Sequence, residues 1–239
     1  MAKKAATDAV HTSTRMSRAN MDTHILRSAI VGALRKNLPK LSGVLLDVGC
    51  GHMPYRELVC APPTRVERYI GLDLQDGEYD TPPDLTWDGK AIPLESGAVD
   101  SALATELFEH CPEPEAVMRE IARVLKPGGV LFFTVPFVWP LHDVPHDEYR
   151  YTPFSLERHL SASGFVEIEM RALGGWDSTM ALVLALWVRR RPMSVLKRRV
   201  LSALLLPFVR ALHRHDRPPP RFSDDWLFPG IAGTAANKA

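Results

Sequence analysis

The segment Leu45–Pro54 reads LLDVGCGHMP and joins an apolar run to two closely spaced glycines. Such a short apolar run is typical of a strand that is buried on both faces of a parallel sheet. Gly49 and Gly51 then let the backbone turn tightly and approach a ligand closely. A dinucleotide-binding turn would carry a third glycine where Pro54 stands, and no phosphate-binding G-K-[ST] sequence follows. The segment therefore predicts either a binding turn for a nucleotide-like ligand that needs no phosphate or an ordinary tight turn.

Acidic residues accompany this turn and two later segments. Asp47 precedes the first glycine and can accept hydrogen bonds from an amine. Asp73 ends a second apolar run, where an acid can bind the two hydroxyls of a ribose; a helix N-cap is the alternative. Asp88 and Gly89 could present a carboxylate and backbone amides to an adenine edge, although the D-G pair also favours a plain turn.

Strand-like apolar runs alternate with amphipathic helical segments along the chain. The alternation predicts βαβ units around a parallel sheet, in which ligands bind at the carboxyl ends of the strands. Residues 226–238 could return as a final strand, which two glycines weaken. The expected helices are 22–38, 116–125 and 154–163, and the expected strands are 43–48, 69–73, 99–104, 130–135 and 165–170.

Four segments, in order, resemble the class I S-adenosylmethionine-dependent methyltransferases, specifically the large bacterial type 11 group. They read LLDVGCG, YIGLDL, WDGKAIPLESGAVDSALATELFEH and AVMREIARVLKPGGVLFFTVP, and the resemblance covers about residues 40–170. It implies a Rossmann-like, doubly wound α/β fold with a seven-stranded mixed sheet whose last strand is antiparallel. The implied cofactor, S-adenosylmethionine, has an adenine and a ribose but no phosphate, which suits the turn at Gly49.

The resemblance also assigns the cofactor-binding residues. The first motif would line the methionine and ribose part of the cofactor with Asp47, Gly49 and Gly51, and the second would hold the ribose hydroxyls with Asp73 and Leu74. The third would meet the adenine with Asp88 and Gly89, and the segment after the next strand, Thr105 and Glu106, would lie near the methionine end.

Methyl transfer to a hydroxyl requires a base for the acceptor's proton. Residues 135–156 form a proline-fixed loop with the pattern P-x-H-x-x-P-x-D-x-x-R-Y-T, which resembles a methyltransferase subgroup often associated with glycan or cell-envelope biosynthesis. We expect His142 to be the base, with Asp147 orienting it or serving instead. Arg150 would hold an anionic acceptor group or lock the loop through Asp147. The alternative is a purely structural network that closes the loop over the cofactor.

Two other groups of residues are candidates for a role at the acceptor site. Glu109 and His110 follow the strand 99–104 and are a second candidate segment for the base. A metal site is conceivable, but Pro145 disfavours the helix on which an H-x-x-x-H pair binds metal conveniently, so we predict none. That metal site would comprise His142, His146, Asp143 and Glu148.

The composition of the chain indicates its class, its compartment and its domain organisation. The chain has 239 residues and a net charge of +1, which argues against a dedicated nucleic-acid binder. Three cysteines form no paired framework and favour reduced thiols in a cytoplasmic protein. We expect a flexible N-terminus over residues 1–20 and a single domain over 21–239. A helical insert at about 178–217, rich in Lys and Arg, would touch an anionic membrane surface, cap the acceptor pocket or form a homodimer, or simply pack on the sheet.

These observations lead to one function and two alternatives. We expect S-adenosylmethionine-dependent O-methylation of a hydroxyl on a sugar, a glycan precursor or another small metabolite, by a cytoplasmic protein that lies at the inner face of the membrane if the insert binds lipid. One alternative is C- or N-methylation of a quinone-like or lipid-like metabolite. The other is a cofactor-binding protein without catalysis that docks through its basic segment.

Overall fold

A computed structural model describes residues 15–75 and 81–238, and residues 1–14, which include most of the predicted flexible N-terminus, lie outside the described residues. The chain divides into two compact units. The sheet unit contains the described residues of 34–170 and those from Ile231 on, and the helical unit contains the described residues up to Ala33 and Arg171–Gly230. The predicted insert lies within the second segment of the helical unit.

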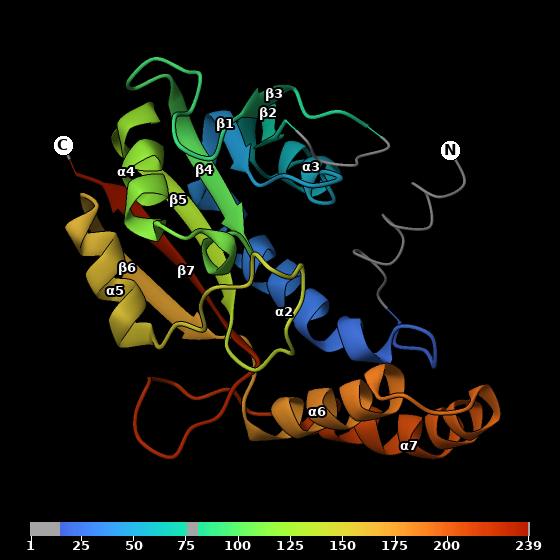
Figure 1. Ribbon diagram of the computed structural model, residues 1–239. Coiled ribbons are helices and arrows are strands. Elements are labelled where there is room, and N and C mark those ends of the chain that lie inside the picture. Colours follow the sequence, from blue (N-terminus) through green and yellow to red (C-terminus); the bar gives the residue numbers. More distant parts are fainter. Residues whose placement is uncertain (1–14, 76–80, 239) are drawn as a thin grey trace. The chain divides into compact units, whose positions relative to one another are not determined.

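The strands of the described chain form one seven-stranded sheet in the order β3-β2-β1-β4-β5-β7-β6. Parallel pairing joins β1 to β2 and β4, β2 to β3, and β4 to β5, while Figure 1 shows β7 running opposite to its neighbours. The predicted α/β Rossmann-like mixed sheet is thus confirmed. The strands are β1 (Ser42–Val48), β2 (Arg65–Leu74), β3 (Leu85–Trp87), β4 (Val99–Thr105), β5 (Leu125–Pro136), β6 (Phe165–Ala172) and β7 (Gly230–Asn237).

The helices form where caps and apolar periodicity predict them. Thr152 caps α5, where its hydroxyl accepts a hydrogen bond from the Ser155 N–H at 3.2 Å, and a proline follows at the first helical position. In the sheet unit α4 packs against α5, and in the helical unit α6 packs against α7. The helices are α2 (Met21–Asn37), α3 (Arg56–Cys60), α4 (Pro114–Val124), α5 (Pro153–Ala162), α6 (Trp176–Arg190) and α7 (Val195–His215), and short 3-10 turns are η1 (Leu38–Lys40) and η2 (Phe108–His110).

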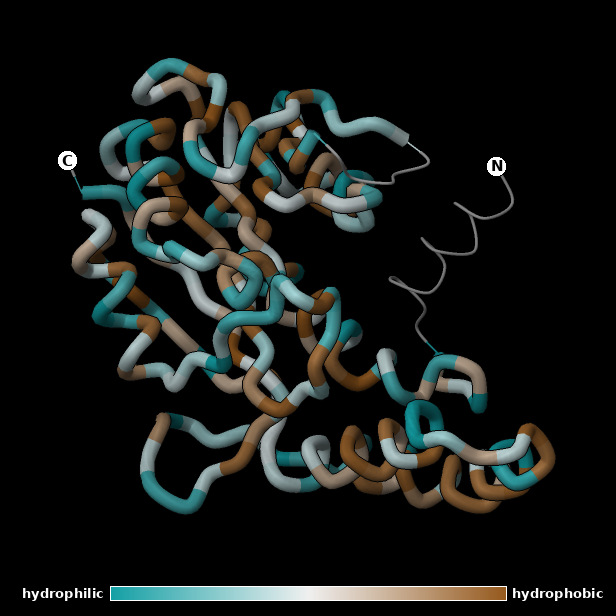
Figure 2. The backbone as a smooth tube through the Cα atoms, viewed as in Figure 1, coloured by the Kyte–Doolittle hydropathy of each residue, from teal (hydrophilic) through white to brown (hydrophobic). Residues whose placement is uncertain are grey.

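The buried core lies along the central strands. Figure 2 shows hydrophobic residues along these strands, and side chains such as Leu45, Leu103 and Phe132 are fully buried. The parallel registers pair Val48 with Leu72 and Thr105 with Thr134, so the carboxyl ends of β1, β2, β4 and β5 lie at the same edge of the sheet. The motifs that the sequence placed after separate strands therefore meet at one edge.

Some boundaries differ from the prediction. Helix α4 begins two residues early, at Pro114, because proline suits the first turn, where its missing N–H costs no hydrogen bond. The helix-stop segment 126–129 is already part of β5, with Gly128 in the left-handed region at φ +74°. The segment of the predicted helical insert forms two helices, α6 and α7.

Candidate functional site

The turn after β1 is built by hydrogen bonds to β2. The backbone N–H groups of Gly49 and Cys50 donate to the Leu72 carbonyl at 2.9 and 3.1 Å. Gly49 and Gly51 both have positive φ, at +70° and +52°, which glycine adopts without strain. A Cβ on Gly49 would lie 2.8 Å from the Leu107 side chain, whereas a Cβ on Gly51 would meet no atom within 4 Å. The turn thus leaves open space beside Gly51.

Asp73, at the end of β2, faces this turn. Its carboxylate accepts hydrogen bonds from the N–H groups of Gly51 and Leu74, both at 2.7 Å. Leu74 is half-exposed, and its side chain lies 3.5 Å from the position of a Cβ on Gly89. Gly51, Asp73, Leu74 and Gly89, all predicted to bind the cofactor, therefore lie near one another after the ends of β1, β2 and β3.

Asp47 is buried between β1 and β2, with one unsatisfied oxygen. The Tyr69 hydroxyl donates a short hydrogen bond to Oδ2, while Oδ1 has no partner. Burial raises the pKa of Asp47 to about 7, the Tyr69 hydrogen bond opposes this shift, and the charge of Asp73 adds to it. A buried carboxylate oxygen without a partner is suited to a cationic ligand group, such as the ammonium of a methionine moiety.

Asp88 differs in character from the other predicted cofactor residues. Its exposed carboxylate accepts hydrogen bonds from the N–H groups of Lys90 and Ala91, at 2.9 and 3.1 Å, and these bonds lower its pKa. Gly89 has φ +80°. The Asp-Gly pair thus forms the turn that the sequence offered as its alternative, and contact with an adenine stays a prediction.

The end of β4 carries a strained acidic residue. Glu106 follows Thr105 at φ +52°, an uncommon conformation for a side chain larger than asparagine. Its N–H donates to the Thr134 carbonyl at 3.0 Å, and the Thr134 hydroxyl donates to its carboxylate at 2.9 Å. Burial raises the pKa of Glu106 to about 7. Because such backbone conformations concentrate at functional sites, this position is a candidate for ligand contact.

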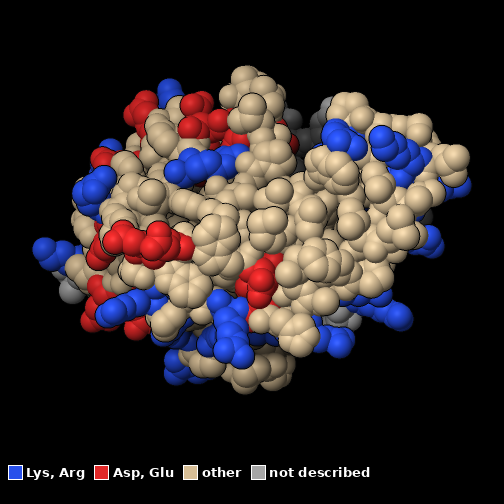
Figure 3. Space-filling model, turned by 90° about the horizontal axis from the view of Figure 1, so that it is seen from below, with Lys and Arg blue, Asp and Glu red and all other residues tan. Residues whose placement is uncertain are grey.

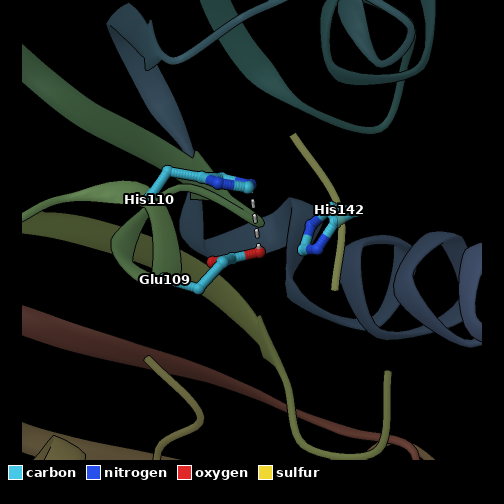
Figure 4. Close-up of side chains that lie close together, drawn as sticks. All are labelled: Glu109, His110 and His142. Atoms are coloured by element: carbon cyan, nitrogen blue, oxygen red, sulfur yellow. Dashed lines mark ion pairs between the residues drawn. The ribbon is translucent and has the colours of Figure 1, made fainter. Parts of the chain in front are cut away.

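Beyond Glu106, three side chains with polar tips come together (Figure 4): Glu109, His110 and His142. Glu109 is fully buried, and neither carboxylate oxygen has a hydrogen-bond partner. Burial raises its pKa well above the usual range, and the charge of Glu106 adds to this. His110 Nε2 lies 3.8 Å from Glu109 Oε1, and the two imidazole rings are 4.7 Å apart between centroids.

The loop that carries His142 is locked by an ion pair. Arg150 donates to both carboxylate oxygens of Asp147, at 2.7 and 2.8 Å, and also to the carbonyls of Tyr149, Trp139 and Pro140. Asp147 in turn accepts a hydrogen bond from the His142 N–H at 3.1 Å, and the Arg150 pairing lowers its pKa. These hydrogen bonds favour the structural alternative for Asp147 and Arg150, and their part in catalysis stays a prediction.

Sequence reasoning separated residues that the structure joins. The candidate segments containing Glu109 and His142 both follow strands that end at this edge of the sheet. That their side chains meet could not be predicted, because it depends on the path of the loop that carries His142. Among the described residues, the group that could hold a metal ion is Glu109, His110 and His142, which shares only His142 with the loop set that the sequence made conceivable. Asp143 lies 4.0 Å from His110, and His146 contributes its carbonyl rather than its ring.

Comparisons with known proteins agree with this geometry. Residues 46–133 match a family model described as a methyltransferase domain. Over 124 residues the chain is 29% identical to the ubiquinone biosynthesis O-methyltransferase of Bordetella bronchiseptica, covering 46% of this chain and 50% of that protein. Over 214 residues it is 27% identical to the malonyl-[acyl-carrier protein] O-methyltransferase of Methylococcus capsulatus, covering 77% of each. The first of these alignments therefore spans about half the length of the curated relative.

The fold has solved counterparts. The crystal structure of a SAM-dependent methyltransferase from Archaeoglobus fulgidus matches with a TM-score of 0.54 and 16% sequence identity, covering 88% of this chain and 94% of that chain. At this identity the likeness concerns the fold, which agrees with the sheet order described above.

Proposed function

We propose that this chain, which carries a class I S-adenosylmethionine-dependent methyltransferase domain, methylates a hydroxyl group of a small molecule. The cofactor of this domain is S-adenosyl-L-methionine. When bound, it supplies an electrophilic methyl group, so the protein mainly positions the acceptor and handles its proton. The observation that carries the proposal is the meeting of the cofactor motifs and the Glu109–His110–His142 group at one edge of the sheet.

The cofactor side fits the residues present. The open space beside Gly51 allows close approach of a ligand, and Asp73 stands where ribose hydroxyls could replace its backbone partners. The unpartnered Oδ1 of Asp47 would accept a hydrogen bond from the ammonium of the methionine part. Thr105 and Glu106 would border that part from β4.

The proposed acceptor side centres on His142, the base expected from the sequence, together with Glu109 and His110, whose side chains lie beside it. We assign to this group the removal of the proton from the acceptor's hydroxyl, and to Asp147 and Arg150 the positioning of the loop. O-Methylation is also what the names of the two curated relatives describe for those proteins. A glycan-precursor acceptor stays a prediction from the loop pattern alone.

The test is transfer of a labelled methyl group from S-adenosylmethionine to panels of hydroxyl, amine and carbon acceptors. His142→Ala should lower turnover of a hydroxyl acceptor by about 10²–10⁴-fold while cofactor affinity is unchanged. His159→Gln is the matched control, because the His159 side chain is 31% exposed beside Glu115, against 25% for His142 beside Asp147. Label on nitrogen or carbon would support the C- or N-methylation alternative, and cofactor binding without any transfer would support the non-catalytic one.

We also infer that the α6–α7 pair contacts a lipid surface and that the acceptor is amphiphilic. Among the described residues, no helix is both long and apolar enough to cross a membrane. However, α7 exposes a stripe of large apolar side chains and contains no acidic residue. Figure 3 shows Lys and Arg around much of the margin of the face seen from below, with uncharged surface and a few acidic side chains between them. Apolar and basic surface together favour an anionic bilayer over a protein partner. The stripe comprises Leu196, Val200, Leu204 and Phe208.

A further inference from the structure

The ligand atoms of Glu109, His110 and His142 lie within 4.8 Å of one another. Bond lengths of about 2.1 Å place the ligand atoms of a tetrahedral Zn²⁺ roughly 3.4 Å apart. The separation of 3.8 Å between His110 Nε2 and Glu109 Oε1 is close to that value. A small contraction would therefore let all three side chains bind one ion.

The carboxylate of Glu109 supplies an independent reason to expect a ligand. Its side chain is completely buried, and both oxygens lack a hydrogen-bond partner. A buried carboxylate is costly unless it is paired, coordinates a metal ion or becomes protonated. Its main-chain carbonyl is already satisfied by the N–H groups of Glu148 and Tyr149, so the polar group without a partner is the side chain that points to the two histidines.

Both histidines have the outer contacts that metal-binding histidines usually show. His110 Nδ1 lies 2.7 Å from the His146 carbonyl, which can only accept, so Nδ1 carries the proton and Nε2 keeps its lone pair. His142 Nδ1 lies 3.3 Å from Asp147 Oδ2, although the two atoms do not form a hydrogen bond. An acid at Nδ1 favours the same tautomer, with the lone pair on Nε2.

We propose that Glu109, His110 and His142 bind one divalent transition-metal ion of the Zn²⁺ class. Two histidines and one carboxylate are a donor set of catalytic zinc sites, in which a further coordination position stays open. A catalytic role for the ion rests on the proposed function. The acceptor's hydroxyl oxygen would occupy the open position, where the ion would lower the pKa of the hydroxyl so that its proton passes to water. His142 is then a ligand rather than the base, and the sequence prediction of no metal is replaced.

The experiment is calorimetric titration of the full-length, metal-stripped protein with ZnCl₂ and, in parallel, with CoCl₂ read by absorbance. We expect one ion per chain and a Co²⁺ spectrum of nitrogen and oxygen ligands without a thiolate band. His110→Ala and Glu109→Gln should each weaken binding at least tenfold, whereas His159→Gln should not. Glu109 is buried, so Glu109→Gln could prevent folding. In that case His142→Gln serves as a third variant, because the His142 side chain is partly exposed.

Two results would overturn the proposal: no ion bound by a folded wild-type protein, or equal binding by the His110, Glu109 and His142 variants. The second would show that the ion binds elsewhere. Titration of the same samples with S-adenosylhomocysteine separates this proposal from the methyltransferase function. A protein that binds the cofactor product but no metal would refute only the metal site.

Discussion

Replacing Gly51 with alanine should separate the cofactor turn from the fold. Gly51 has φ +52° and open space where a Cβ would stand, so the added methyl group meets no protein atom within 4 Å. The cost to folding is then the left-handed conformation alone, about 1–2 kcal/mol. The space taken by the methyl group is, however, the space that we assign to the cofactor.

Gly97 provides a matched control, since it has φ +68° and equally open surroundings but lies in the turn before β4. Both alanine variants should lose about the same free energy of unfolding, measured by urea denaturation. Only Gly51→Ala should also lose affinity for S-adenosylhomocysteine, by at least about tenfold or 1.4 kcal/mol, in calorimetric titration. Equal affinities in the two variants would refute the placement of the cofactor beside Gly51.

Three further predictions concern charge and surface. Burial raises the pKa of Asp47 from 3.8 to about 7 in the folded protein. Wild type should therefore lose stability relative to Asp47→Asn as pH rises from about 4 through 7, and a pH-independent difference between the two free energies of unfolding in urea would contradict this. Asp147→Asn removes a charge from a bidentate pair with Arg150 and should lower the free energy of unfolding by about 1–3 kcal/mol, and an unchanged value would mean that the pair does not hold the loop. Phe208→Glu should weaken co-sedimentation with anionic vesicles, whereas Val166→Glu, also at an exposed apolar position, should not; equal losses would argue against the α7 stripe.

Much of the sheet could be predicted because its strands are short apolar runs bounded by turn residues. Leu45 and Leu46 are fully buried at the centre of the sheet, as a run without polar alternation implies. Asp73 could be placed because parallel strands end at one edge, and its bond to the Gly51 N–H joins the two predicted motifs directly. These inferences needed only local pattern and topology.

The partners of individual acids could not be predicted in the same way. The hydrogen bond between Tyr69 and Asp47 depends on the register of β1 against β2, in which Asp47 stands opposite Gly71. Asp88 looks like a ligand-binding acid in the sequence but uses its carboxylate in a local turn. Such outcomes are decided by register and by competition with backbone donors.

The arrangement of the acceptor side could not be predicted from the sequence, because it depends on the path of a long loop. His142 was expected there from its position after β5, but its approach to Glu109 depends on the Asp147–Arg150 pair and on the hydrogen bond from His110 to the His146 carbonyl. The complete burial of Glu109 also had no sequence signal, because glutamate is usually exposed.

The chain is proposed to bind S-adenosylmethionine through the acid at the end of β2. The most direct test is calorimetric titration of the protein with S-adenosylmethionine and with its demethylated product, comparing wild type with Asp73→Ala. We expect wild type to bind both compounds with micromolar affinity, and the variant to bind them at least about tenfold, or 1.4 kcal/mol, more weakly. A folded wild-type protein that binds neither compound, or a variant that binds both as tightly as wild type, would contradict it.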